Sequence, residues 1–328
     1  MSLRIVRSGI LTSVQADPRL GSRRFGVSSG GALDLVALRV LNTLVANEAQ
    51  AAVLEIVSGV VRLEFSEPRL IAWGGGEYEV RVGQTLLSAG HVAAVAENEE
   101  VSVAGPKEGF RAWLAISGGI DVPEVLSSRS TDVRAHFGGW QGRPLQDGDV
   151  IPLGSHSSRS LALLKGLGNR AVADWSAPFE WAHPSAAPPV LHFLRGKDWE
   201  SFDPPSRSRF SGTTFSVAPE SDRMGIRLRG ELLKREDEDD LVSEAVAPGT
   251  IQVPPNGQPI LLLGDCQTIG GYPKLAHVIS TDLPRAAQLR PGEGVMFQEV
   301  SLADAHARLG QLERDLVKFA IGLAVAKR

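Results

Sequence analysis

The most informative part of the chain reads Gly249-Thr-Ile-Gln-Val-Pro-Pro-Asn-Gly-Gln-Pro-Ile-Leu-Leu-Leu-Gly-Asp-Cys-Gln-Thr-Ile-Gly-Gly-Tyr-Pro273. Its apolar centre, Ile260 to Leu263, has the length of a short buried strand, and turn-forming residues bound it on both sides. Similar runs rich in Val, Leu and Ile recur along most of the chain, separated about every ten residues by Gly, Pro, Asn or Asp. This rhythm predicts a mainly β fold with few helices, either a barrel or a sandwich.

The bulk composition limits the possible classes of function. A length of 328 residues favours two compact units. The 38 acidic and 34 basic side chains give a formal net charge of -4, without the positive field that nucleic-acid binding needs. The single cysteine, Cys266, excludes an intrachain disulfide framework and is compatible with a reducing, cytoplasmic compartment. The sequence contains neither a signal-peptide core nor a membrane-spanning apolar run, so we expect no membrane partner.

Two segments have the apolar spacing of helices. The first runs from about Ala32 to Ala46, and the second follows Ser301, which we expect to cap it. The terminal helix could pack on its own domain or dock a partner subunit. A stretch rich in Pro, Ser and Ala at 178–189 predicts a linker. We therefore expect one domain at 1–185, a second at 190–300 and an amphipathic helix at 301–328.

Glycine-broken polar segments mark a candidate site in the first half of the chain. They are Gly26 to Asp34, Ser117 to Asp121, Ser127 to Asp132 and Gly138 to Arg143. The first precedes the early helix, where its amides could face an anion or Asp34 could support the first helical turn. Arginine forks suit carboxylate or phosphate groups, which makes Arg129 and Arg143 binding candidates. An ion-pair network that only ties loops together would give the same pattern, so both interpretations stay open.

A denser polar group lies in the second half. Ser221 to Leu228 places Asp222, Arg223 and Met224 before a glycine, and strand-like residues follow. In the quoted stretch, the side chains of Gln252, Asp265, Gln267 and Tyr272 offer both donors and acceptors, as an amide or ureide substrate would require. Structural turn amides are the alternative.

Several other kinds of chemistry find little support in the sequence. Cys266 has no recognisable histidine partner, so we interpret it as a small buried side chain. The seven histidines are scattered, and we predict no metal held by the protein. Gly74 to Gly76 has no following lysine and hydroxyl pair, so no phosphate-binding loop is recognisable. The charge run at 234–240 predicts a solvated loop.

Taken together, these segments resemble the family that includes the C subunit of bacterial 5-oxoprolinase. The family is also labelled allophanate hydrolase subunit 2 or biotin-dependent carboxyltransferase. Further matching strings occur in the expected order, and the resemblance covers about residues 4 to 303; they are Ser13 to Gln15, Gly30 to Asp34, Leu44 to Asn47, Ser117 to Asp121, Ser130 to Asp132 and Gly138 to Arg143. Ile269 stands where threonine is common in the family, so the choice of substrate can differ.

The resemblance implies two cyclophilin-like β-barrel domains in one chain. It also implies one of three functions. The first is ATP-dependent opening of 5-oxo-L-proline to L-glutamate together with subunits A and B. The second is a biotin-dependent carboxyltransferase or a urea- or allophanate-type amide hydrolase, and the third is non-catalytic antagonism of a kinase inhibitor. We favour the first function, with ATP held by or shared with a partner subunit.

The resemblance and the polar pattern together give a set of candidate roles. Arg223 or Arg129 would steady anionic groups, and Asp222 or Asp265 would position a proton or a nearby arginine. The predicted catalytic residues are Asp222, Arg223, Gln252, Asp265 and Gln267. The predicted substrate-binding residues are Gln15, Arg129, Ser130, Asp132, Arg143, Met224, Gly270, Gly271 and Tyr272.

Overall fold

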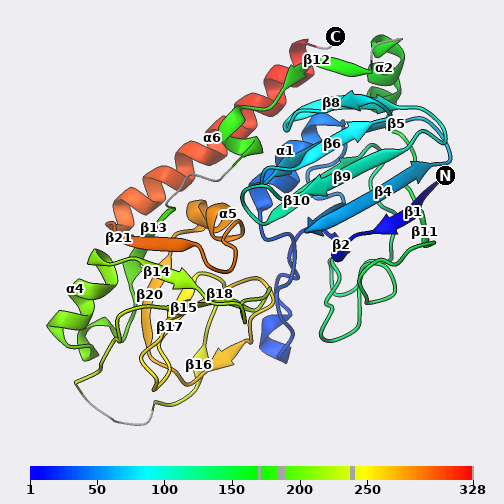
Figure 1. Cartoon of the computed structure of the whole chain (residues 1–328). Helices are drawn as coiled ribbons and strands as arrows, with labels where there is room; N and C mark the ends of the chain where they lie inside the picture. The colour runs from blue at the N-terminus through cyan, green and yellow to red at the C-terminus, as the bar shows by residue number, and fades with distance from the viewer. Residues whose placement is uncertain (169–170, 184–188, 237–240, 327–328) are drawn as a thin grey trace. The chain divides into compact units, whose positions relative to one another are not determined.

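The computed structural model describes residues 1–168, 171–183, 189–236 and 241–326. The chain forms two compact units that interleave along the sequence (Figure 1). The first unit comprises Met1–Pro18, Asp34–Ser185 and Leu316–Arg328, and the second comprises Arg19–Leu33 and Ala186–Asp315. Compared with the predicted ranges, residues 19–33 group with the second half, and the terminal helix is divided between the units.

Two six-stranded sheets build the first unit. One contains, in spatial order, β11 (Val150–Pro152), β1 (Ser2–Ser8), β4 (Gly59–Phe65), β9 (Val101–Gly105), β6 (Glu79–Val82) and β7 (Thr85–Leu86). The other contains β12 (Val172–Ser176), β8 (His91–Val95), β5 (Arg69–Gly75), β10 (Arg111–Ile116), β3 (Val53–Val57) and β2 (Leu11–Gln15). All the pairings within these sheets are antiparallel, so neighbouring strands can be joined by short turns.

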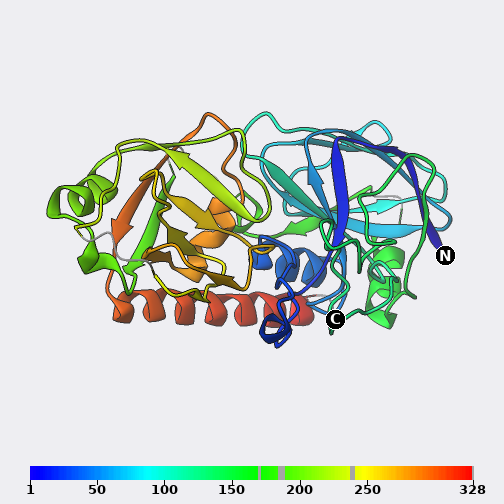
Figure 2. The same cartoon turned by 90° about the horizontal axis from the view of Figure 1, so that it is seen from below.

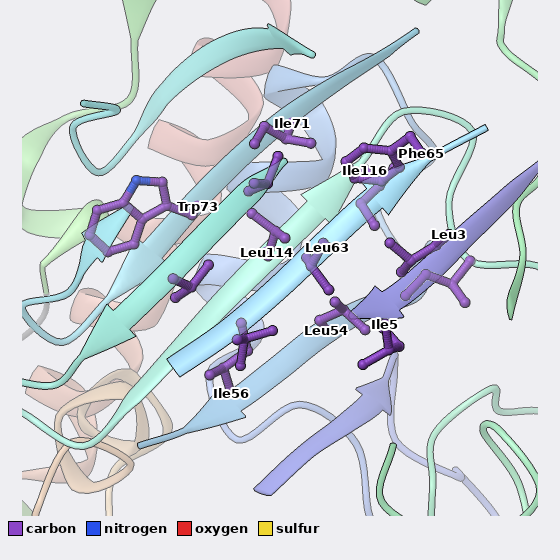
Figure 3. Packing of buried hydrophobic residues seen from close by; sticks show 14 of the residues in the cluster. Leu3, Ile5, Leu54, Ile56, Leu63, Phe65, Ile71, Trp73, Leu114 and Ile116 are labelled. Carbon is purple, nitrogen blue, oxygen red and sulfur yellow. The ribbon is translucent and has the colours of Figure 1, made fainter. Parts of the chain in front are cut away.

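The core of the first unit follows the two-residue period of its strands. Alternate residues such as Leu3 and Ile5 on β1 and Leu63 on β4 are fully buried. Figure 3 shows how the apolar side chains gather in this cluster; those labelled are Leu3, Ile5, Leu54, Ile56, Leu63, Phe65, Ile71, Trp73, Leu114 and Ile116. Burial of this apolar surface is the main driving force for folding of the unit.

The second unit is a closed barrel. Its strands, in order around the barrel, are β13 (Val190–Arg195), β20 (Lys274–Val278), β17 (Thr250–Gln252), β18 (Ile260–Leu262), β15 (Gly225–Arg229), β14 (Phe215–Val217) and β21 (Gly294–Glu299). The parallel pairing of β13 with β21 closes the ring. Buried aromatic rings support it, and those of Phe210 and Phe297 stack with centroids 4.7 Å apart. A separate ribbon pairs β16 (Glu244–Ala245) with β19 (Ile269–Gly270).

Helices are few and mostly short. They are α1 (Leu35–Leu44), α2 (Ser158–Leu167), α3 (Phe179–Ala182), α4 (Pro204–Gly212), α5 (Leu283–Ala286) and α6 (Leu302–Ala326), with single 3₁₀ turns at Arg23–Phe25, Trp199–Ser201 and Ser280–Asp282. The side chain of Asp34 accepts a hydrogen bond from the backbone N–H of Ala37 and so caps α1. The long helix α6 is unbroken (Figure 2), and Ser301 accepts a bond from the Asp304 N–H at its start.

These findings confirm the prediction of a mainly β chain with few helices, a barrel and a C-terminal helix. Both predicted helical segments are helices, although α1 is shorter than the predicted range. The predicted linker at 178–189 begins with the short helix α3 instead of extended chain. Residues 184–188 of that linker and residues 237–240 of the charge run lie outside the described part of the chain.

Candidate functional site

The pairing of β15 with β18 brings the two polar segments of the second unit together. Gly225 lies opposite Leu262 in this antiparallel pair. The ladder continues beyond the strands, because the Leu263 N–H bonds to the Met224 carbonyl and the Asp265 N–H bonds to the Arg223 carbonyl. Two residues that are 42 positions apart in the sequence therefore lie side by side in the barrel.

Arg223 and Asp265 form a buried bidentate ion pair. The Arg223 Nε donates to Asp265 Oδ2 at 2.8 Å, and its Nη2 donates to Asp265 Oδ1 at 3.0 Å. Nη2 also donates to the Gly31 carbonyl at 2.7 Å. Both side chains are less than a tenth exposed, so each charge depends on the other for the hydrogen bonds that water would otherwise supply. The pair fixes the loop after β18 to the backbone of Gly31.

Residues 19–33 are fastened to the same loop. The Gly30 N–H bonds to the Gly264 carbonyl at 2.9 Å. The Arg23 Nη2 donates to the carbonyls of Val246 and Gln267. Gly30 has φ +60, and a Cβ built there would lie 2.6 Å from Nη1 of the buried Arg19. These contacts explain why the segment belongs to the second unit, and they favour glycine at position 30.

The predicted amide-binding residues also come together. The Gln267 Nε2 donates to Gln252 Oε1 at 3.2 Å, and the Gln252 Nε2 donates to the Tyr272 carbonyl at 3.2 Å. Gln252 is buried, whereas Gln267 and Tyr272 are exposed. A Cβ at Gly270 would lie 2.7 Å from the Gln252 Nε2, so β19 passes directly against this amide. We name Gln252, Gln267 and Tyr272 the amide group.

The structure adds a residue that our sequence analysis missed. Lys274 lies opposite Gln252 in the pairing of β17 with β20, and it is only 8% exposed. Its Nζ lies 3.4 Å from Glu244 Oε2, and Lys197 bonds to the other oxygen of Glu244. The hydrogen bond from Lys197 is the largest cause of the lowered pKa of Glu244. The signal available in the sequence was a lysine at the start of a mostly apolar strand, directly after the motif.

Asp222, Met224 and Cys266 have structural contacts. Asp222 Oδ1 accepts bonds from the N–H groups of Met224 and Gly225 and so closes the turn before β15. Cys266 is fully buried, and this burial raises the pKa of its thiol, which disfavours the thiolate. The catalytic role of Asp222 stays a prediction.

In the first unit, the predicted binding residues Gln15 and Ser130 are fully buried. The Gln15 Nε2 donates to Ser13 Oγ at 3.0 Å and to the Thr131 carbonyl at 3.2 Å. The Ser130 hydroxyl accepts a bond from the Ala16 N–H at 2.8 Å. These contacts fasten the end of β2 to the loop at 128–132.

The other predicted residues of the first unit make similar contacts. Arg129 Nε donates to the Val122 carbonyl at 3.1 Å. Asp132 Oδ1 accepts from the N–H groups of Arg134 and Ala135. Arg143 makes a bidentate pair with Asp149, with both bonds 2.8 Å long. All these side chains therefore have structural partners, and the binding roles predicted for them stay predictions.

Two negative observations apply to the described residues. In the ranges given above, no group of three or more His, Cys, Asp or Glu side chains is placed to hold a metal ion. Across the same residues, no helix combines the length and hydropathy needed to cross a bilayer.

Comparison with known proteins places this geometry in context. The family model described as "Carboxyltransferase domain, subdomain A and B" matches residues 25–299. The chain is 37% identical to the C subunit of 5-oxoprolinase from Escherichia coli, over 92% of this chain and 93% of that protein. It is 34% identical to the C subunit of 5-oxoprolinase from Haemophilus influenzae, over 89% of both proteins.

A solved structure has the same architecture. The crystal structure of the K. lactis urea amidolyase matches 97% of this chain with a TM-score of 0.87 and 26% sequence identity. The chain spans only 20% of the length of that protein. The family match covers both polar segments that meet in the barrel, and the two relatives match over nearly their full length. The chain belongs to the carboxyltransferase domain family, subdomain A and B.

Proposed function

We propose that this chain is one component of an ATP-dependent 5-oxoprolinase that opens 5-oxo-L-proline to L-glutamate together with subunits A and B. The observation that carries the proposal is the amide group of Gln252, Gln267 and Tyr272 beside the rigid Arg223–Asp265 loop. The 37% identity to the C subunit of the Escherichia coli 5-oxoprolinase supports it.

The amide group suits a lactam for a simple chemical reason. A lactam presents one N–H donor and one carbonyl acceptor in a fixed cis arrangement, and a glutamine side chain offers the complementary acceptor and donor. The buried Gln252 is held by the Tyr272 carbonyl and accepts a bond from the exposed Gln267, so the orientation of Gln267 is fixed before substrate arrives. Fixed donors also stabilise the negative charge that develops on an amide oxygen during activation.

In the proposed reaction, the lactam oxygen attacks the γ-phosphorus of ATP, and ADP leaves. Water then adds to the activated carbon and the ring C–N bond breaks, which gives γ-glutamyl phosphate. A second water hydrolyses this acyl phosphate, and glutamate and phosphate are released. Within the described ranges, the glycines at Gly74 and Gly75 are part of β5, and a Cβ at Gly75 would meet the Arg111 carbonyl at 2.2 Å. These glycines serve strand packing rather than a phosphate cradle. We therefore assign the nucleotide to a partner subunit.

The test combines the purified chain with subunits A and B and measures glutamate release from 5-oxoproline with and without ATP. We expect ATP-dependent release by the wild type and at least about a tenfold lower rate with Gln267→Leu, because a bidentate contact is lost. Gln298→Leu, an exposed glutamine on β21, is the matched control and should keep the wild-type rate. Full activity of Gln267→Leu would refute the assigned site.

A biotin-dependent carboxyltransferase is the second candidate, because the K. lactis urea amidolyase has the same architecture at a TM-score of 0.87. This function requires a biotinylated carrier protein and an amide acceptor such as urea. We expect no transfer of labelled carboxylate from carboxybiotin to urea when this chain is the only carboxyltransferase domain present. Transfer at a rate comparable to glutamate release would favour the second candidate.

A further inference from the structure

The position of Lys274 suggests which chemical group of the substrate it binds. Its Nζ lies 3.4 Å from Glu244 Oε2 and 3.5 Å from the Gly270 carbonyl, and the side chain is about nine-tenths buried. A lysine is rarely buried to this extent unless its ammonium group has a carboxylate partner. The second unit therefore has a buried ammonium group, the Lys274 Nζ, that already pairs with a carboxylate.

The carboxylate that occupies this site comes from outside the barrel. Glu244 belongs to the two-stranded ribbon of β16 and β19, and its side chain is 42% exposed. The exposed Lys197 also holds it, at 2.5 Å. Lys197 lies close to Glu244 because the preceding residue, Gly196, packs on the backbone of Lys274. A Cβ added to Gly196 would lie 2.0 Å from the Lys274 carbonyl. Glu244 can therefore leave Lys274 and keep a cationic partner.

The Lys274 ammonium group lies next to the amide group, because Lys274 is paired with Gln252. Lys274 and Gln252 are direct neighbours across β20 and β17. Gly270, whose carbonyl is near the Lys274 Nζ, also passes against the Gln252 amide. An ammonium group and a fixed primary amide thus lie one strand apart. This combination matches a small lactam that carries a carboxylate on the ring.

We propose that Lys274 binds the carboxylate of the lactam substrate, and that Glu244 occupies this position when substrate is absent. The inference rests on the proposed function and assigns a specificity-determining residue to it. On binding, the substrate carboxylate replaces Glu244 at the Lys274 Nζ, and Glu244 stays paired with Lys197. The ring amide then faces the exposed side chain of Gln267, which Gln252 orients. A neutral lactam would leave the Lys274–Glu244 pair in place and would bind without this contact.

The experiment measures KM for 5-oxoproline and the inhibition constant of its neutral carboxamide in the complex with subunits A and B. Lys274→Met should raise KM about tenfold or more, since a hydrogen bond between two charged groups is lost, and should leave the inhibition constant of the carboxamide within about twofold. Glu244→Gln should lower KM by about two- to threefold, because the competing carboxylate is removed. Lys107→Met removes an exposed lysine that pairs with an exposed carboxylate in the first unit, and it should change KM by less than about twofold.

The outcomes separate the two proposals. A wild-type complex that releases no glutamate overturns the proposed function and this inference with it. An active wild type with unchanged KM in Lys274→Met overturns the inference alone, as does an equal loss of affinity for the acid and the carboxamide. If Lys274→Met fails to fold, the exposed substitution Glu244→Gln decides, and a raised or unchanged KM counts against the proposal.

Discussion

Both compact units contain an arginine that makes a bidentate pair with an aspartate, and the two pairs differ in what they join. Arg143 and Asp149 are six residues apart, and Asp149 also accepts a bond from the Gln146 N–H, so this pair closes one turn. Arg223 and Asp265 are 42 residues apart, and Arg223 also binds the Gly31 carbonyl. The first pair orders a local loop, and the second joins three separate segments of the chain.

The difference between the pairs extends to the polar side chains around them, and it favours the second unit as the one that binds a ligand. In the first unit, the polar side chains of the predicted site bind nearby backbone groups and complete the loops. In the second unit, Arg23, Arg223 and Gln252 bind backbone carbonyls, whereas the exposed amide of Gln267 donates to another side chain, that of Gln252. Side chains that are not needed to complete loops can contact a ligand at little cost to stability.

The buried Arg223–Asp265 pair of the second unit should contribute the most to stability. Arg223→Ala removes the partner of a buried carboxylate, so we expect the free energy of unfolding to fall by about 3–5 kcal/mol. Arg143→Ala is the matched control: its partner Asp149 is more exposed, and we expect a loss of about 1 kcal/mol or less. Urea unfolding of both variants measures the difference.

The double substitution Arg223→Met with Asp265→Leu tests the reason for that effect. It removes both charges and fills the space with apolar side chains, so it should be less destabilising than Arg223→Ala alone. If the double variant is the less stable one, the cost comes from the lost contacts of the loop rather than from the unpaired carboxylate.

The sequence predicted the local features of this molecule far better than its long-range contacts. Strands and both helical segments follow from periodicity, and the amide group was found because Gln252, Gln267 and Tyr272 lie in one polar stretch. The contact of Gly30 with Gly264 depends on a fold that brings together distant parts of the chain, and no local pattern encodes it. Lys274 was missed because strand register, which places it opposite Gln252, is not visible in the sequence.

The first unit contains a buried aspartate, Asp34, whose carboxylate accepts hydrogen bonds from backbone N–H groups. Burial raises the pKa of Asp34 to about 7, because the N–H bonds at the start of α1 do not compensate for the loss of water. Between pH about 4 and 7, the folded protein keeps a proton that the unfolded chain loses. The stabilisation is therefore complete at low pH and is lost as the pH rises through 7, by on the order of 2–4 kcal/mol.

Asp34→Asn tests this pH dependence. Asparagine caps helices about as well as aspartate and does not ionise, so the variant should lack this part of the slope between pH about 4 and 7. Urea midpoints of the wild type and the variant at several pH values provide the measurement. Parallel pH profiles for the two proteins would mean that Asp34 stays ionised throughout.

Asp222 lies beside Arg223 in sequence, but its contacts in the structure are local. Asp222→Ala removes the acceptor for the N–H groups of Met224 and Gly225, and we expect a loss of about 1 kcal/mol in stability. Asp222→Asn keeps a side-chain oxygen and should restore most of it. Glutamate release by the assembled complex separates this structural role from the predicted catalytic one: a rate within about twofold of the wild type in Asp222→Asn would leave the structural role alone. A tenfold lower kcat in Asp222→Asn, with unchanged stability, would instead support a proton-handling role for this carboxylate and extend the functional site to the turn before β15.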